Sequence, residues 1–309
     1  MRVRFWGVRG SIPCPGPTTV RYGGNTPCLE LRLPDRDRLV IIDAGSGLRE
    51  LGNALLGRDL ARGPLVTQLF LTHTHWDHIM GFPFFVPIYI PGTRLTVYGP
   101  ATYEDESLAD IVGGQLTYRY FPVRQTDLAA NIQYVHLREG RYDLGEGLVV
   151  STKYLNHPVL CLGYRFEYRG LTLCTAYDTE PFANVFCTDP GDPAFDEAIA
   201  EEGARAAAEE NARVEAFFAG ADLLIYDAQY TREEYQASKR GWGHSPMDHA
   251  VAAARRAGVR RLALFHHEPL RTDDQLDAQA AIHASGPDDP GPEIFFAREG
   301  TEIDLATGS

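Results

Sequence analysis

The stretch His73-Thr-His75-Trp-Asp77-His78 decides how this sequence is interpreted. It follows the apolar run 66–71, which predicts a strand that ends just before the first histidine. Because side chains alternate along a strand, His73 and His75 point the same way, and the turn brings Asp77 and His78 to the neighbouring position. Imidazole nitrogens and carboxylate oxygens are ligands that zinc, manganese and iron prefer. The spacing therefore predicts a metal site at the end of this strand.

Strand and helix patterns alternate along most of the chain. Strand-like runs at 3–8, 27–33 and 39–43 predict an antiparallel start, and later strands arrive both as hairpins and as strand-then-helix units. This pattern predicts an α/β protein with two mixed sheets, each covered by helices. No low-complexity linker divides the sequence, so we expect a single domain over 1–309, with an acidic helical insertion at about 180–220. We expect this insertion to be a solvated packing helix, with a lid or a dimer contact as the alternative.

The His-x-His-x-Asp-His pattern resembles the signature of the metallo-β-lactamase superfamily. The resemblance extends over residues 3 to about 270 and implies an αββα four-layer sandwich. It implies that His157 in Leu-Asn-His-Pro and Asp178 in Ala-Tyr-Asp-Thr belong to the site. The last histidine of the pattern is His266 by alignment, and the adjacent His267 is the alternative.

This resemblance also implies two divalent metal ions, with Zn²⁺ as the expected metal and Mn²⁺ as the alternative. One ion would be held by His73, His75 and His157, and the other by Asp77, His78 and His266, with Asp178 and a nucleophilic hydroxide between them. Asp77 is thereby expected to be a catalytic residue as well as a ligand. Two ions, two aspartates and one hydroxide leave a net charge of about +1, which suits a phosphodiester monoanion.

A further histidine, His244, is a candidate general acid. A phosphodiester releases a poor alkoxide leaving group, which needs a proton. Ser245 and Asp248 predict an N-terminal cap of the next helix, so His244 should lie just ahead of that helix. The arrangement resembles the ribonuclease Z branch of the superfamily, in which an acidic residue orients this histidine. In this sequence the acidic residue is Asp227. The alternative interpretation of His244 is a loop histidine that only caps the next helix.

The sequence departs from ribonuclease Z where that family carries its tRNA-gripping arm. Only 21 residues separate His157 from Asp178, which leaves room for two strands and a turn but not for a tRNA arm. The runs 7–13 and 21–26 resemble a bacterial and phage group that includes the anti-Pycsar phosphodiesterases. We therefore expect a phosphodiesterase for small phosphodiesters, cyclic nucleotides first. The alternatives are a ribonuclease Z-like nuclease, a thioester or lactone hydrolase, and a binding protein that does not cleave its ligand.

Charge and cysteine content limit the partners and the compartment. The chain has 29 basic and 42 acidic residues, a formal net charge of −13, which repels nucleic acids and acidic membranes at long range. Its five cysteines are widely spaced, as expected for reduced thiols. No export signal or membrane span is visible. We expect a cytoplasmic protein and, by the resemblance, a homodimer.

Aromatic residues near these motifs are candidates for stacking on a nucleobase. They are Tyr22, Trp76 and Trp242, and the ordinary expectation for each is packing in the core.

Overall fold

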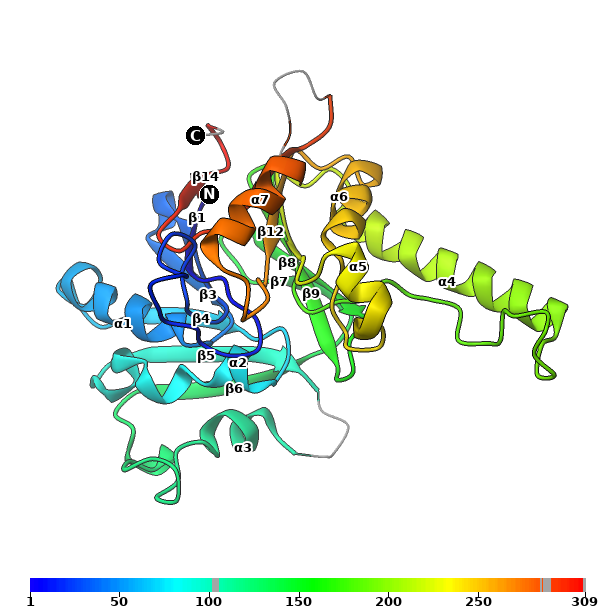
Figure 1. Cartoon of the computed structure of the whole chain (residues 1–309). Helices are drawn as coiled ribbons and strands as arrows, with labels where there is room; N and C mark the ends of the chain where they lie inside the picture. Colours follow the sequence, from blue (N-terminus) through cyan, green and yellow to red (C-terminus); the bar gives the residue numbers. More distant parts are fainter. Residues whose placement is uncertain (102–105, 284, 286–289, 308–309) are drawn as a thin grey trace.

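Two seven-stranded mixed sheets form the centre of the molecule (Figure 1). The computed structural model describes residues 1–101, 106–283, 285 and 290–307. The first sheet has the strand order β14 (Glu302–Asp304), β1 (Arg2–Gly7), β2 (Cys28–Leu33), β3 (Arg38–Ile42), β4 (Val66–Phe70), β5 (Arg94–Pro100) and β6 (Asn131–Leu137). The second has the order β13 (Glu293–Phe296), β12 (Arg261–Phe265), β11 (Leu223–Asp227), β10 (Leu171–Ala176), β9 (Cys161–Tyr168), β8 (Leu148–Leu155) and β7 (Gly140–Asp143).

Helices cover the outer face of each sheet. The α-helices of the described residues are α1 (Gly47–Arg58), α2 (Trp76–Ile79), α3 (Leu108–Gly113), α4 (Glu197–Phe218), α5 (Arg232–Glu234), α6 (Met247–Arg256) and α7 (Asp273–His283). Helices α1 and α3 pack on the first sheet, and α4, α6 and α7 pack on the second. The layers are helix, sheet, sheet and helix, which confirms the predicted αββα sandwich.

Apolar side chains form one core between the sheets and one under each helical layer. Phe5, Val40 and Phe70 from the first sheet meet Phe166 and Phe265 from the second in the central core. Strands β11 and β12 are buried along their whole length, as expected for parallel strands that are covered on both faces. Burial of this apolar surface is the main stabilising term of the fold.

The direction of the strands determines where the site forms. Strands β1, β2 and β3 are antiparallel as predicted, while β3 and β4 are parallel. In the second sheet β10, β11 and β12 are parallel, and β8 runs with them because β9 lies antiparallel between β8 and β10. The carboxyl ends of these parallel strands therefore point toward the same edge of each sheet.

Two short edge strands and the position of the insertion complete the fold. The sequence did not predict β7 or β14, which lie at the edges of their sheets. Helix α4 projects from the side of the molecule and carries acidic residues of the predicted insertion (Figure 1). Within the described ranges, no helix has the length and apolar composition that a membrane crossing requires.

Candidate metal centre

The candidate ligands come from loops that follow the carboxyl ends of strands in both sheets. His73 and His75 follow β4, His157 follows β8, Asp178 follows β10 and His266 follows β12. Asp77 and His78 lie in α2, directly after the β4 loop, and both are buried. The structure thus brings together residues that are as much as 193 positions apart in the chain (266 − 73).

A first group consists of His73, His75, His157 and Asp178, whose ligand atoms all lie within 4.8 Å of one another. His73 Nε2 lies 3.4 Å and His157 Nε2 lies 3.8 Å from Asp178 Oδ2. His157 Nε2 is 3.0 Å from His75 Nδ1. Histidine nitrogens and one carboxylate oxygen therefore converge on a single point, as in a metal site.

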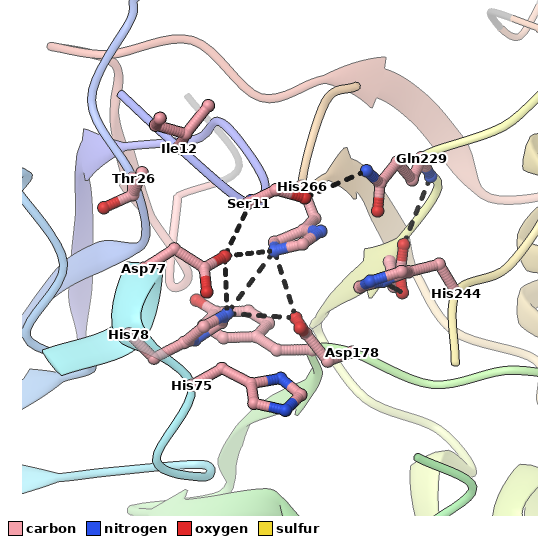
Figure 2. A network of polar contacts seen from close by, with 12 residues as sticks. Ser11, Ile12, Thr26, His75, Asp77, His78, Asp178, Gln229, His244 and His266 are labelled. Atoms are coloured by element: carbon pink, nitrogen blue, oxygen red, sulfur yellow. Dashed lines mark hydrogen bonds and ion pairs between the residues drawn. The ribbon is translucent and has the colours of Figure 1, made fainter. Parts of the chain in front are cut away.

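A second group consists of Asp77, His78, Asp178 and His266, again with ligand atoms within 4.8 Å (Figure 2). His266 Nε2 lies 3.2 Å from Asp77 Oδ2 and 3.2 Å from Asp178 Oδ1. His78 Nε2 is 3.2 Å from Asp178 Oδ1 and 3.4 Å from His266 Nε2. Asp178 belongs to both groups and offers one oxygen to each, so the two groups fit a pair of ions with a shared carboxylate.

Unsatisfied buried atoms show that the chemistry of these groups fits cations. His73 Nε2 and Asp178 Oδ1 are buried and have no hydrogen-bond partner among the described residues. An unpaired buried polar atom costs about 1–3 kcal/mol, which a coordinated ion would remove. Burial holds the pKa of His73 well below its usual range and lowers that of His157 to about 4, so both imidazoles are neutral and able to coordinate.

The pKa of Asp178 also favours coordination. Burial works against its ionisation, but the neighbouring His266, His78 and His73 hold its pKa well below the usual range. Asp178 is therefore ionised, as a carboxylate that coordinates two ions must be.

Hydrogen bonds to the far ring nitrogens fix the orientation of two of the histidines. Asp43 Oδ2 lies 2.7 Å from Nδ1 of His78, and the Gly243 carbonyl oxygen lies 2.9 Å from Nδ1 of His157. Both imidazoles are thereby held with Nε2 directed into the centre. Asp43 is not among the residues predicted from the sequence, although it directly follows β3, just as other residues of the centre directly follow their strands.

Three residues of the centre have a left-handed backbone. The φ angles are 60° at Asp43, 41° at Asp178 and 62° at His266. Such conformations cost about 1–3 kcal/mol each for residues other than glycine. Each lies where the chain leaves a strand and turns its side chain toward the centre.

The two adjacent histidines after β12 have different surroundings. His266 lies in the second group, whereas His267 Nε2 is 2.8 Å from the Ala297 carbonyl oxygen. Gly10 packs against His266, and a Cβ on Gly10 would lie 2.5 Å from His266 Nδ1. The geometry thus places His266 with the candidate ligands and His267 in the surrounding core.

His244 and Asp227 form a pair at the edge of the two groups. His244 Nδ1 lies 2.8 Å from Asp227 Oδ2, and the His244 ring stacks on His266 with centroids 4.9 Å apart. Burial disfavours the protonated form of His244, but the charge and hydrogen bond of Asp227 outweigh it, and the pKa rises to about 9. The ligand atoms of Asp178, Asp227, His244 and His266 also lie within 4.8 Å of one another. His244 is therefore placed either to donate a proton or to bind an ion.

Two local predictions near His244 and the aromatic residues need correction. Ser245 does not cap α6, because the helix starts at Met247 and the Ser245 hydroxyl donates to the Thr179 carbonyl oxygen instead. Core packing is correct for Tyr22, which is fully buried, and wrong for Trp76 and Trp242, which are 74% and 57% exposed.

Comparisons with known families agree with this geometry. Residues 21–160 match the model of the metallo-beta-lactamase superfamily, and residues 203–267 match the model of a beta-lactamase superfamily domain. The chain belongs to the metallo-β-lactamase superfamily and is a hydrolase of that class.

The chain is similar in sequence to proteins named ribonuclease Z. It is 28% identical to ribonuclease Z of Lactococcus lactis subsp. lactis, a match that covers 86% of this chain and 88% of that protein. It is 25% identical to ribonuclease Z of a Synechococcus strain over 99% of both chains. These relatives agree with the resemblance to the ribonuclease Z branch.

Solved structures share the fold. The metallo-beta-lactamase fold protein YhfI of Bacillus subtilis has a TM-score of 0.62 at 18% identity, covering 97% of this chain and 98% of that one. A diphosphatase of the PhnP family has a TM-score of 0.61 at 16% identity, with 98% and 97% covered. The short form of human tRNase Z has a TM-score of 0.59 at 19% identity, with 99% of each chain covered.

Proposed function

We propose that this hydrolase is a phosphodiesterase with two divalent metal ions and that it cleaves small phosphodiesters, most of all cyclic nucleotides. The observation that carries the proposal is the Asp227–His244 pair beside the two ligand groups. A thioester hydrolase has no need of such an acid, because a thiolate departs without a proton. A phosphodiester with an alkoxide leaving group does need one.

The residues divide into ion-binding and proton-donating roles. His73, His75 and His157 would hold one ion, Asp77, His78 and His266 the other, and Asp178 would serve both. When bound, such ions supply Lewis acidity to the phosphoryl group and lower the pKa of water toward neutrality. Zn²⁺ suits these imidazole and carboxylate ligands, and Mn²⁺ is the alternative.

His244 would protonate the leaving oxygen. Asp227 holds its Nδ1, which leaves Nε2 for the substrate. With a pKa near 9 the ring carries its proton at neutral pH, so it starts the reaction in the acid form. Asp227 also accepts a hydrogen bond from the Thr179 backbone at 3.1 Å, which keeps the carboxylate in place.

Chain length and charge support a small substrate. Strands β9 and β10 occupy most of the chain between His157 and Asp178. The formal net charge of −13 also opposes approach of a polyanion. The similarity to ribonuclease Z over nearly the whole chain favours RNA as the second candidate substrate.

A substrate panel tests the proposal on protein loaded with Zn²⁺ or Mn²⁺. The panel contains 3′,5′- and 2′,3′-cyclic nucleotides, bis(p-nitrophenyl) phosphate, a precursor tRNA, S-lactoylglutathione and an acyl-homoserine lactone. We expect hydrolysis of the cyclic nucleotides and of bis(p-nitrophenyl) phosphate. Turnover of only the thioester or the lactone would refute the phosphodiesterase assignment, and preferred turnover of precursor tRNA would refute the small-substrate assignment.

A further inference from the structure

A groove of about 780 Å³ opens beside the metal centre. His157 forms part of its wall and also belongs to the first ligand group, so the groove lies next to the centre. Its remaining walls come from the segment after β10 and from the loop that leads to His244. Its volume falls within the range of about 300–1,000 Å³ that is typical of small-molecule sites.

Helix α4 supports the wall that follows β10. The Asn211 side chain accepts a hydrogen bond from the Phe182 backbone at 2.9 Å and donates one to the Phe182 carbonyl oxygen at 2.8 Å. Asn184 donates to the Ala200 carbonyl oxygen at 2.7 Å. A Cβ on Gly203 would lie 2.1 Å from Asn184 Oδ1, so the glycine allows this close contact. The acidic insertion therefore holds one wall of the groove in place.

A single carboxylate fixes the opposite wall. Glu180 accepts hydrogen bonds from the Tyr235 hydroxyl at 2.7 Å and from the backbone of Gly241 at 2.8 Å and Gly243 at 2.9 Å. These three hydrogen bonds occupy the Glu180 carboxylate with partners inside the protein. The same loop carries the Gly243 carbonyl that meets His157, which ties the shape of the groove to the centre.

The chemistry of the walls suits a flat apolar group with one negative charge beside it. Pro158, Pro181, Phe182 and Val185 supply apolar surface. Arg240 also lines the groove, is exposed, and forms no ion pair with any described residue. Its guanidinium lies 6.0 Å from the centroid of the Tyr235 ring. A planar heterocycle can pack on such a surface, while Arg240 can bind an anion or stack on the ring.

We propose that this groove, built on α4, binds the nucleoside part of the substrate and determines which phosphodiester is cleaved; the inference rests on the proposed function. Helix α4, which supports the groove, contains six glutamates and two arginines and is therefore acidic as a whole. That charge disfavours a second nucleotide unit with its own phosphate. The groove thus takes one nucleoside rather than a strand of RNA.

Equilibrium binding of AMP to the zinc-loaded protein tests the groove without any turnover. Isothermal titration calorimetry compares AMP with ribose 5-phosphate, which has the phosphate but no base. We expect AMP to bind wild-type protein at least about tenfold more tightly than ribose 5-phosphate. Ala183→Trp, which fills the groove, and Arg240→Ala should each weaken AMP binding about tenfold or more.

Matched variants control for the size and charge of these changes. Ala206→Trp adds the same side chain at an exposed position of α4, and Arg119→Ala removes an exposed arginine that follows α3. Both should bind AMP like the wild type. Zinc content and thermal midpoint of every variant verify that the centre and the fold are intact.

The results separate this inference from the proposed function. Equal affinity for AMP and ribose 5-phosphate, or wild-type AMP binding by both groove variants, would refute the groove even if phosphodiesters are cleaved. A different outcome would refute only the proposed activity. In that outcome the wild type binds AMP more tightly than ribose 5-phosphate, the groove variants lose this preference, and no phosphodiester is hydrolysed.

Discussion

Replacing His244 with alanine separates proton donation from metal binding. The charge and hydrogen bond of Asp227 raise the pKa of His244 to about 9, so the wild-type protein carries the acid form at neutral pH. Loss of a general acid typically costs about 10²- to 10⁴-fold in rate, or about 2.7–5.4 kcal/mol in activation free energy. We expect His244→Ala to lower kcat for a cyclic nucleotide by that factor and to retain its metal.

The leaving group provides the assay. A cyclic nucleotide releases a ribose alkoxide, whereas bis(p-nitrophenyl) phosphate releases a phenolate that needs no proton. His244→Ala should therefore reduce kcat on bis(p-nitrophenyl) phosphate by less than about tenfold. Steady-state kinetics on both substrates and metal analysis of the same samples give the comparison.

The pH profile gives an independent reading of the same group. Protonated His244 is lost as pH rises through its pKa, so activity on cyclic nucleotides should fall on the alkaline side. The charges of Asp178 and Asp77 contribute to the pKa near 9, and bound cations would neutralise them, so the fall should occur at or below pH 9. The activity of the His244→Ala variant should not show this fall on the alkaline side.

One outcome would refute the reasoning outright. The ligand atoms of His244, Asp178, Asp227 and His266 lie close enough together to hold an ion of their own. If His244→Ala lost a metal ion, or if both substrates suffered equally, His244 would be a ligand or a structural residue and not the acid.

Three other substitutions test neighbouring parts of the centre. Asp227→Asn removes the charge that raises the pKa of His244. The fall in activity at alkaline pH should therefore occur at least about one pH unit lower, while the metal content stays constant. A fall at the same pH as in the wild type would contradict the pairing of Asp227 with His244. His75→Ala should lose bound metal and activity together, and full metal content by elemental analysis would remove His75 from the ligand set. Asp43→Ala frees Nδ1 of His78 and should weaken affinity for one ion about 10- to 100-fold in a competition titration with a chelator, while unchanged affinity would mean that Asp43 only stabilises the fold.

The sequence predicted the parts of the structure whose signal lies in spacing. A fixed pattern of histidines and aspartate after an apolar run identified the end of β4. Strand β7 was missed because Gly140-Arg-Tyr-Asp143 has neither a continuous apolar run nor a clear alternation, and only Tyr142 is partly buried. Strand β14 is three residues long and leaves almost no period to detect.

Contacts between distant segments could not be read from local patterns. The choice between His266 and His267 depends on which ring faces the centre, which the left-handed backbone at His266 decides. Asp43 lies 35 residues from His78, and nothing near either residue in the sequence indicates their hydrogen bond. Ser245 matches the sequence pattern of a helix cap, but its hydroxyl donates a hydrogen bond to the Thr179 carbonyl oxygen instead.

The left-handed backbone at Asp43, Asp178 and His266 has a consequence for how this protein would respond to laboratory evolution. Glycine or asparagine in place of Asp178 or His266 would relieve conformational energy, so variants screened only for heat resistance in the presence of a chelator would accumulate there, whereas the buried hydrogen bonds of Asp43 to Thr72 and His78 retain Asp43. Those variants would resist heat but would have lost catalytic activity. A screen that demands heat resistance and turnover together should leave these three positions untouched and draw its gains from elsewhere in the chain.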